Sequence, residues 1–578
     1  MIKIPSEEKR IMQICGGDVF GNVLGSFNLD LIGNPGTFRI TRMLKTTDGA
    51  VTDFGVPVAF KYFGNAALDA VYAICGGYVF RGSSGITGNF TKLTSPSGAP
   101  TGLDSDDDLE EFNNALYITG GTTVDHLYKL SSSNGFSDFD CGNLALGKLI
   151  VYGNRLYAKS GNTLILSINT SDTPSISGAN TLQLSGWSNG IIRTMLPATN
   201  RIWVCTLNPD GGYGAVFDWD GVSEVVTARH LLPTAGVLSA VLLDDTPYIF
   251  DADGVLRAFI GGFFQEVARL PLKRKLLDEV TMTDSSVRPV HPNGMTVDDG
   301  EILINIRGTF EDGHVDEYVP SGIWAYNKEN GLYHKYSFSL RNYSGGTQLD
   351  YGQHKISKVG ALKKIKLVDN NDGVLIAGAE IYSDATTVLA GSFIDHSLDT
   401  IQKAGYFLTP RLEAGSLKDN WAPLTATIKK FATATDKLVA KFRTSEDVPT
   451  EATCTWASTT SFTTTTDITS YEIGDEVEIV NGVGGGLCAH ITRITTNDPI
   501  AGTYTIFIDE TFGEATGTAK IRFSKWIKID DLDYDYGSVE QVKTLDFRGV
   551  ARYIQFKIWM TWTGDKELRE LLIDNKPF

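Results

Sequence analysis

The densest group of residues that could hold a metal ion is the acidic run LDSDDDLEE. Asp104, Asp106 and Asp108 alternate as the oxygen ligands of a helical calcium loop do. Such a loop needs glycine at its sixth position and a bidentate glutamate at its twelfth, where this chain has Leu109 and Ala115. We therefore predict a solvated acidic loop and no metal site.

Patterns for phosphate-binding or acid–base chemistry are absent from the sequence. GxSxG occurs once, in GWSNG at 186–190, which we interpret as a turn and not as a nucleophile. The glycine run NGVGGG at 481–486 lacks the Lys-Ser or Lys-Thr of a phosphate loop. No two of the eight histidines are spaced as i, i+2 or i, i+4, and the six cysteines form no CxxC pair. The sequence thus predicts no catalytic residues, no cofactor and no enzymatic activity.

The alternative to a protein without such chemistry is a glycoside-cleaving or sugar-binding protein. It would need two carboxylates about 5–10 Å apart facing one funnel. Asp218, Asp220, Asp251 and Asp253 are candidates, but the glycines beside them indicate turns between strands instead.

The elements that would position such residues are short strands that recur as hairpins. Each copy is a short apolar strand, a turn with glycine or serine, and a second short strand. The copies occupy 78–93, 127–139, 164–184, 215–226, 255–267 and 323–336. A period of roughly 40 residues with four short strands per unit is typical of a β-propeller.

A second pattern marks the same period, because a turn residue is followed three positions later by a large apolar residue. The pairs are Gly76/Val79, Asn114/Tyr117, Asn154/Tyr157, Asn200/Trp203, Asp245/Tyr248, Gly300/Leu303 and Asp372/Leu375. Seven pairs predict about seven blades, with six or eight and a multi-sheet sandwich array left open.

Length and composition support an all-β protein of several domains. The chain has 578 residues, 42% of them apolar and 21% charged, with 60 glycines. No apolar run is long enough to span a membrane, and the N-terminal MIKIPSEEKRIMQI lacks the apolar core of a signal peptide. The net charge of −18 argues against wrapping of nucleic acid by the whole surface.

The change in strand character along the chain predicts four parts. Residues 1–70 form an N-terminal closure segment, which supplies a closing strand or lines one face, and 71–400 form the β-propeller. Longer alternating strands in 401–445 and 524–578 form a β-sandwich. Residues 446–523 form a small β-barrel inserted into it.

Two stretches carry a resemblance to a known class of proteins. GDVFGNVLGSFNLDLIGNPGTFRITRML, at 17–44, precedes the propeller repeats. KLVAKFRTSEDVP at 437–449 leads into TCTWASTTSFTTTTDITSYEIGDEVEIVNGVGGGLCAHITRITTNDPIAGTYTIFIDETFGEATGTAKIRFSKW at 453–526. The chain resembles virion structural proteins of tailed bacteriophages, in particular tail nozzle or packaged-DNA stabilisation proteins of short-tailed phages.

This resemblance implies a structural subunit of the tail or neck of a virion, made in the host cytoplasm. It implies a homo-oligomeric ring, usually a hexamer, that contacts the tail adaptor or portal-proximal proteins and lets DNA pass through its lumen. In such a ring the strip Lys273, Arg274 and Lys275 would contact the DNA backbone. A carbohydrate- or receptor-binding propeller, such as a lectin or a tail-tip adhesin, is the alternative function.

Overall fold

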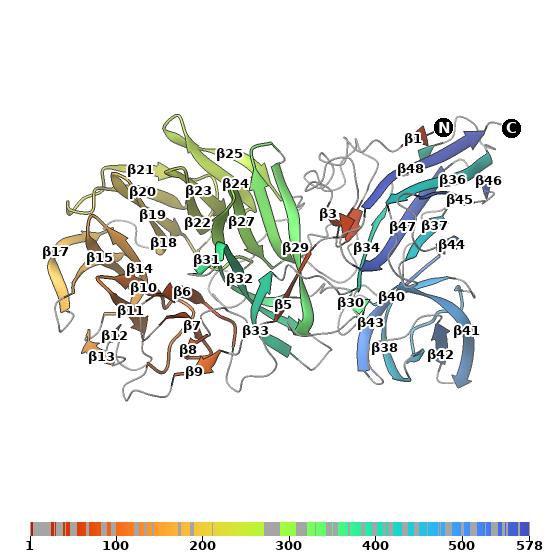
Figure 1. The fold of residues 1–578 in the computed structure, drawn as a ribbon, viewed down its shortest axis with the longest axis horizontal. Coiled ribbons are helices and arrows are strands. Elements are labelled where there is room, and N and C mark those ends of the chain that lie inside the picture. Colours follow the sequence, from red (N-terminus) through yellow and green to blue (C-terminus); the bar gives the residue numbers. More distant parts are fainter. Residues whose placement is uncertain are drawn as a thin grey trace.

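All regular elements that the computed structural model describes are β-strands (Figure 1), which confirms the prediction of an all-β chain. No helix long and apolar enough to cross a membrane occurs within the described residues. The structure describes residues 2–3, 25–27, 29–30, 39–40, 42–46, 55–64, 69–82, 90–93, 100–120, 126–131, 136–141, 144–170, 175–184, 190–210, 212–270, 289–307, 321–329, 331–342, 349–350, 356–367, 370–382, 388–395, 402–408, 412–413, 420–429, 437–443, 450–458, 460–471, 473, 475–479, 488–498, 502–508, 517–525, 527–532, 541–545, 549–550, 553–563 and 567–576.

Five successive sheets each contain four antiparallel strands in sequential order. Their strands are β6 (Ala59–Phe63), β7 (Ala70–Cys75), β8 (Tyr78–Arg81) and β9 (Thr91–Lys92); β10 (Leu109–Phe112), β11 (Ala115–Gly120), β12 (His126–Leu130) and β13 (Phe136–Asp140); β14 (Leu146–Tyr152), β15 (Arg155–Ser160), β16 (Leu164–Asn169) and β17 (Ser175–Gln183); β18 (Ile191–Ala198), β19 (Arg201–Leu207), β20 (Ala215–Trp219) and β21 (Ala228–Leu231); β22 (Val237–Leu243), β23 (Thr246–Asp251), β24 (Val255–Ile260) and β25 (Phe263–Arg269).

The next sheet has eight strands in the order β26-β27-β28-β29-β5-β33-β32-β31. Strand β5 comes from the N-terminal part of the chain and pairs parallel with β29 and antiparallel with β33. It joins two groups of strands: β26 (Met295–Asp298), β27 (Glu301–Ile306), β28 (Gly322–Asn327) and β29 (Gly331–Asn342) on one side of β5 (Arg42–Thr46), and β33 (Val388–Asp395), β32 (Asn370–Tyr382) and β31 (Ile356–Leu367) on the other.

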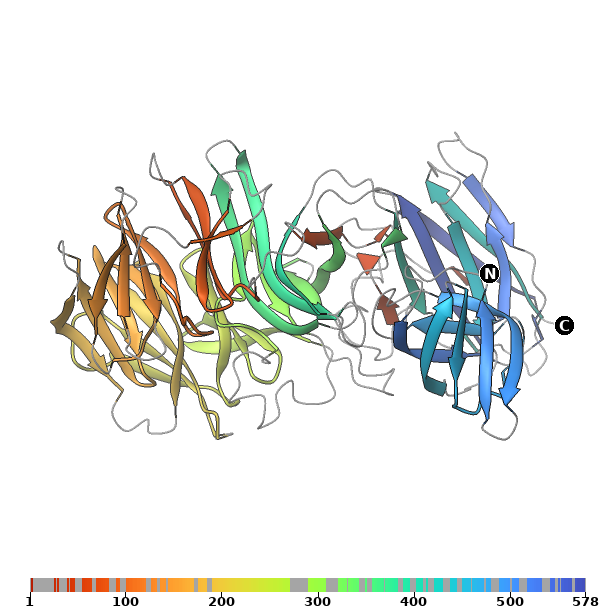
Figure 2. The same ribbon diagram turned by 90° about the horizontal axis from the view of Figure 1, so that it is seen from below.

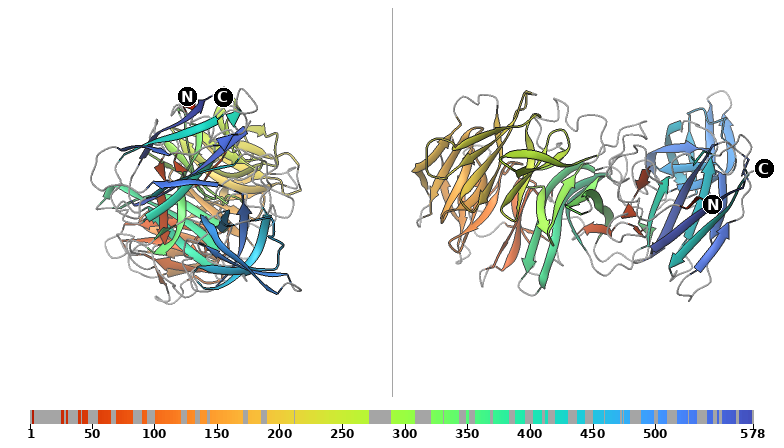
Figure 3. Two further views of the ribbon diagram at one scale, coloured as in Figure 1. Left: turned by 90° about the vertical axis from the view of Figure 1, so that its right-hand side faces the viewer. Right: turned by 90° about the horizontal axis from the view of Figure 1, so that it is seen from above.

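The first strands of these groups contact one another in a closed circle. The order of contacts is β6, β10, β14, β18, β22, β26 and β31, and β31 contacts β6 again. The sheets therefore radiate from a common centre, as they do in propeller-like folds. Figures 2 and 3 show these sheets as one lobe of the molecule.

The turns between the first and second strands explain four of the seven marker pairs, whereas Asp372 lies inside β32. Asn114 and Asn154 occupy equivalent turns, after β10 and after β14, and both have a positive φ (57°). Asp245 (φ 61°) and Gly300 (φ 76°) follow β22 and β26 in the same way. Positive φ at both central positions gives the tight turn that matches the twist of paired strands, and asparagine, aspartate and glycine adopt it at low cost.

The pair Gly76/Val79 does not mark the turn after a first strand, as the sequence pattern predicts, because it lies one strand further along. Gly76 lies in the turn between the second and third strands of its sheet, β7 and β8. The preceding hairpin, β6–β7, has the longer connection 64–69 in place of a two-residue turn, so it lacks the marker. This first sheet consequently begins at Ala59, within the segment 1–70 that we expected to precede the propeller.

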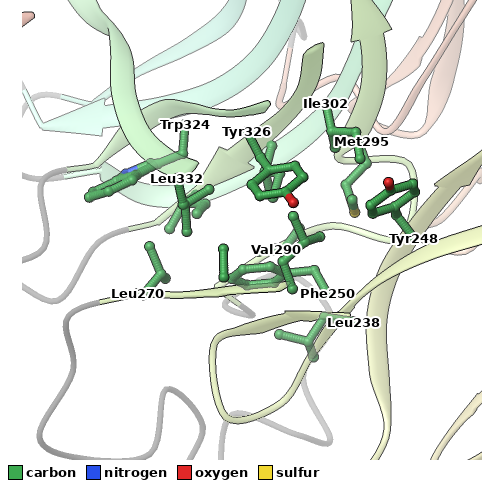
Figure 4. Packing of buried hydrophobic residues seen from close by; sticks show 14 of the residues in the cluster. Leu238, Tyr248, Phe250, Leu270, Val290, Met295, Ile302, Trp324, Tyr326 and Leu332 are labelled. Atoms are coloured by element: carbon green, nitrogen blue, oxygen red, sulfur yellow. The ribbon is translucent and has the colours of Figure 1, made fainter. Parts of the chain in front are cut away.

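Apolar side chains from neighbouring sheets fill the space between them. Figure 4 shows the cluster between the sheet of β22–β25 and that of β26–β29, where Tyr248 and Phe250 face Trp324 and Tyr326. Trp324 is 1% exposed. Burial of such large apolar areas is the main force that holds the sheets together.

The backbone packs closely where β31 meets β6 and closes the circle. The N–H of Ala361 donates to the carbonyl of Pro57 (2.9 Å), and Asn305 Nδ2 donates to the carbonyls of Gly360 (3.2 Å) and Gly378 (2.9 Å). A Cβ on Gly360 would lie 1.9 Å from the carbonyl oxygen of Pro57. Only glycine fits here.

The other lobe combines two sheets and a closed barrel. One sheet has the order β1-β48-β36-β45, with β46 on β36, and the other β2-β34-β47-β37-β44, with β30 on β34 and β35 on β47; β3 and β4 pair separately. The strands are β1 (Ile2–Lys3), β2 (Gly25–Phe27), β3 (Leu29–Asp30), β4 (Arg39–Ile40), β30 (Leu349–Asp350), β34 (Gln402–Leu408), β35 (Leu412–Glu413), β36 (Asn420–Lys429), β37 (Lys437–Arg443), β44 (Ile527–Leu532), β45 (Gln541–Leu545), β46 (Gly549–Val550), β47 (Tyr553–Thr563) and β48 (Glu567–Lys576).

The barrel lies in the chain between β37 and β44, which pair with each other. It closes in the order β38-β39-β42-β41-β40-β43 around apolar side chains that include Trp456, Phe462 and Phe523. Its strands are β38 (Thr450–Ser458), β39 (Ser461–Thr464), β40 (Glu476–Ile479), β41 (Cys488–Asp498), β42 (Thr503–Ile508) and β43 (Gly517–Ser524).

We predict that Gly360→Ala destabilises the larger lobe by about 3 kcal/mol, because the added methyl group overlaps backbone that cannot move away. Gly161→Ala is the control: its Cβ meets nothing within 4 Å, and only its positive φ opposes the change. That costs about 1 kcal/mol. Denaturant titration followed by tryptophan fluorescence measures both, and equal losses would contradict the close approach.

We also predict that a buried histidine makes stability depend on pH. His334 in β29 is 2% exposed, and its Nε2–H donates to the carbonyl of Ser321 (3.2 Å). Burial lowers the pKa of His334 to about 4, against 6.5 in the unfolded chain. The unfolded state therefore binds the proton more readily, and stability falls as pH drops from 6.5 toward 4, by about 2 kcal/mol between pH 7 and 5.

His334→Gln keeps a donor for Ser321 but cannot be protonated, so it should remove this part of the pH slope. His126→Gln, in β12 of another sheet, is the comparison variant, and the slope should be reduced more in the His334 variant than in this one. Free energies of unfolding at pH 7 and pH 5 for the three proteins decide the matter. An unchanged slope in the His334 variant would disprove it.

Candidate functional site

The strip Lys273, Arg274 and Lys275 lies outside the described residues, so its expected DNA contact stays a prediction. The acidic run is described, and it is not a solvated loop. Asp107 and Asp108 are each only 4% exposed. The aspartates of the run lie just before β10, one of the first strands, and Asp106 and Asp108 find cationic partners from other sheets inside the circle. The expectation of a solvated loop was wrong for this reason.

Irregularities in the first strands aim charged side chains at this region. The pairing register shifts between Leu146 and Leu149 in β14 and between Ile192 and Thr194 in β18. Each shift leaves a cationic residue, Lys148 or Arg193, out of the regular ladder. β-Bulges commonly re-aim a side chain in this way, and they are frequent near functional sites.

Asp108 joins three sheets. Its Oδ2 lies 2.9 Å from Lys148 Nζ and accepts the N–H of Leu149 (3.1 Å), while its Oδ1 accepts Asn293 Nδ2 (3.3 Å). Lys148 Nζ also donates to Asn293 Oδ1 (2.7 Å). Asn293 precedes β26, which is not a neighbour of β14 in the circle, so this contact is made across the centre.

Asp106 joins two further cations. Its Oδ2 lies 3.4 Å from Lys159 Nζ, and its Oδ1 lies 3.5 Å from Arg193 Nη1. The Arg193 side chain is 1% exposed and that of Lys159 is 8% exposed, whereas that of Asp106 is 40% exposed. Solvent therefore reaches this group from the side of Asp106.

A second segment, before β26, meets the acidic run from the opposite side. His291 Nε2 lies 3.1 Å from the carbonyl of Ser105, and its Nδ1 accepts the N–H of Asn293 (3.1 Å). With Nδ1 as the acceptor, Nε2–H is the donor to Ser105. Ser239 in β22 donates to the carbonyl of Pro292 (2.8 Å).

Three more charged groups complete the set. Lys61 in β6 pairs with Glu110 in β10. Lys363 in β31 is reached by solvent, yet its pKa is lowered, first by the protein packed around it and then by the like charges of Lys61 and Lys148. We call the whole set the central polar cluster: Lys61, Asp106, Asp108, Glu110, Lys148, Lys159, Arg193, Asn293 and Lys363.

The chemistry of the cluster is that of ion pairing and hydrogen bonding. Within the described part of the chain, no three His, Cys, Asp or Glu side chains are grouped so as to hold a metal ion. Asp106, Asp108 and Glu110 each face a Lys or Arg. The arrangement ties sheets together and concentrates positive charge.

The other sequence candidates lie apart from this cluster. Asp251 accepts the N–H groups of Asp253 (3.0 Å) and Val255 (2.9 Å) and pairs with Arg257, which makes DADG a turn between β23 and β24. Asp220 similarly accepts the N–H groups of Val222 (2.8 Å) and Ser223 (2.7 Å).

Sequence reasoning missed the cationic half of the cluster. The available signal was a single charge inside an apolar run, as for Lys148 in LALGKLIVY and Arg193 in IIRTML. Such a residue has to find a partner when its strand is buried. Which partner it finds depends on contacts between sheets that are far apart in sequence.

Comparison with known proteins finds only distant structural matches. No family model and no curated protein matches the chain. Among solved structures, the extracellular domain of a putative hybrid two-component system from B. thetaiotaomicron aligns with 74% of this chain at 10% identity and a TM-score of 0.38. The chain covers 46% of that protein.

Two further matches are similarly distant. A chain of the mitotic checkpoint complex aligns over 64% of this chain and 98% of its own, at 14% identity and a TM-score of 0.38. The computationally designed Ika8 protein aligns over 61% and 99%, at 11% identity and a TM-score of 0.34. At these TM-scores the matches carry no functional information, and none of them indicates a phage protein.

We predict that Asp108→Asn destabilises the larger lobe by about 3 kcal/mol, because the partly buried Lys148 then loses its counter-charge and one amide N–H₂ faces another donor. Asp210→Asn makes the same chemical change at an exposed loop position and should have no measurable effect. Thermal or denaturant unfolding of the two variants provides the measurement. A loss below about 1 kcal/mol for the Asp108 variant would show that the cluster contributes little.

Proposed function

We propose that the chain is a non-enzymatic structural subunit of a bacteriophage tail or neck, which assembles with copies of itself into a ring of the nozzle type. The phage assignment rests on the resemblance of 17–44 and 437–526 to virion structural proteins. The observation that carries the structural role is the central polar cluster. Its carboxylates cross-link sheets, where a glycosidase would keep two of them free for substrate.

The fold proposed for the larger lobe is a seven-bladed propeller. The circle of seven first strands supports it, as does the position of β5 as the outermost strand of a last blade formed with β33, β32 and β31. For the smaller lobe we propose a β-sandwich, built from the sheet of β48 and β36 and the sheet of β47 and β37, with the barrel inserted into it.

In this proposal the propeller is a rigid outer part and not the DNA passage. The two loops that contain Ser105 and His291 meet inside the circle of first strands, so a duplex has no way through it. DNA would pass through the lumen of the assembled ring. An acidic wall, in a chain of net charge −18, would let it slide, because little counterion release holds it there. Lys273, Arg274 and Lys275 are the proposed isolated contacts with the backbone.

The test is the state of assembly of the full chain. Native mass spectrometry should find a closed homo-oligomer, with a hexamer at six times 62.9 kDa, and electron microscopy of particles should place it next to the tail adaptor or portal. A chain that stays monomeric and is absent from particles would refute the proposal. Binding or hydrolysis of glycans by the monomer would favour the carbohydrate- or receptor-binding alternative.

A further inference from the structure

Arg193 is a buried cation that has only part of its hydrogen-bonding capacity in use. It lies at the bulge in β18, and 2% of the residue is exposed. The ion pair from Nη1 to Asp106 Oδ1 is long at 3.5 Å. Neither Nε nor Nη2 has a hydrogen-bond partner in the part of the chain that the structure describes. A buried guanidinium with two unused donors is costly, and native structures rarely keep one.

The two unused donors lie on the same edge of the planar guanidinium group. The Nε–H and Nη2–H bonds run parallel along one edge, and this edge matches two oxygens of a phosphate or a carboxylate. Asp106 is engaged by Nη1, away from that edge. The geometry of the side chain thus presents a bidentate oxyanion-binding edge inside the protein.

The charges around Arg193 favour an anion. In the central polar cluster, Lys61, Lys148, Lys159, Arg193 and Lys363 are five cations, and Asp106, Asp108 and Glu110 are three carboxylates. Within the described residues, the cations of the cluster therefore outnumber its carboxylates by two, and by one when the buried Asp107 is counted. Asp107, the other buried carboxylate of the run, turns back to accept the N–H of Asp104 (2.6 Å). Asp104 is exposed.

We propose that Arg193 and Lys159 bind a small oxyanion of the phosphate class. The Nε–H and Nη2–H of Arg193 hold two of its oxygens, and the ammonium group of Lys159, which shares Asp106 with Arg193, supplies further charge. The anion enters beside Asp106, whose side chain is the most exposed member of this group. Because Arg193 and Lys159 are almost fully covered, the site takes a free ion and excludes the backbone of a nucleic acid.

The bound ion would act as a further link between sheets, since its two ligands lie on β15 and β18. Ion binding that occurs only in the folded state raises the unfolding temperature with ligand concentration. This inference is independent of ring assembly, because it concerns the inside of one chain.

The experiment titrates the full chain with sodium phosphate, at an ionic strength kept constant with sodium chloride, and follows thermal unfolding and isothermal titration calorimetry. We expect one phosphate per chain and a rise in unfolding temperature of about 3 °C at saturation. Arg193→Lys keeps the charge but loses the bidentate edge, so it should abolish the rise in unfolding temperature. Arg201→Lys is the matched control on β19, where the arginine pairs with Asp218 at the surface, and it should keep the rise.

Lys159→Gln provides a second variant in case Arg193→Lys does not fold. It should weaken phosphate binding about tenfold, the effect of losing one charged contact. The proposal is overturned if the wild-type chain shows neither heat nor a shift beyond that of sodium chloride, or if a DNA duplex gives the shift and inorganic phosphate does not. A high-resolution map in phosphate with only water at Nε and Nη2 would overturn it as well.

Discussion

A row of stacked sheets exposes an apolar face at each end unless the two ends meet, and the larger lobe meets this constraint between β31 and β6. Phe60 and Phe80 of the first sheet pack there with Ile365 and Ile376 of the last strands. Polar contacts secure the same junction through the Pro57 carbonyl. Burial of this apolar surface is worth several kcal/mol, so the other junctions in the circle depend on this one being closed.

The centre of the circle poses a different problem, because several first strands converge there and space is limited. An apolar filling would have been possible, yet the chain uses charges that reach across the centre, as Lys148 does to Asn293. Buried ion pairs add little net stability compared with a well-packed apolar core, but they form only with specific partners in a specific geometry. A set of pairs that each join different sheets therefore favours one arrangement of those sheets over others.

Local features of the fold could be predicted from the sequence, and long-range ones could not. The turns at Asn114 and Asn154 follow from residue types that accept a positive φ, and the all-β character follows from the short alternating runs. The predicted start of the first sheet was wrong, because its first hairpin has no such turn. The central polar cluster was invisible, because Asp106 and Arg193 are far apart in the chain and a run of aspartates usually stays in water.

The position of β5 has a consequence for the order of events during synthesis. Its residue Thr46 pairs with Phe393, so the strand leaves the ribosome long before its partner exists. About 350 residues separate the two, which corresponds to roughly 20–70 s of translation at 5–20 residues per second. Throughout that interval the nascent chain carries an unpaired edge, open to pairing with a neighbouring nascent chain. Shielding of β5 while the ribosome finishes the last sheet would limit such pairing between chains.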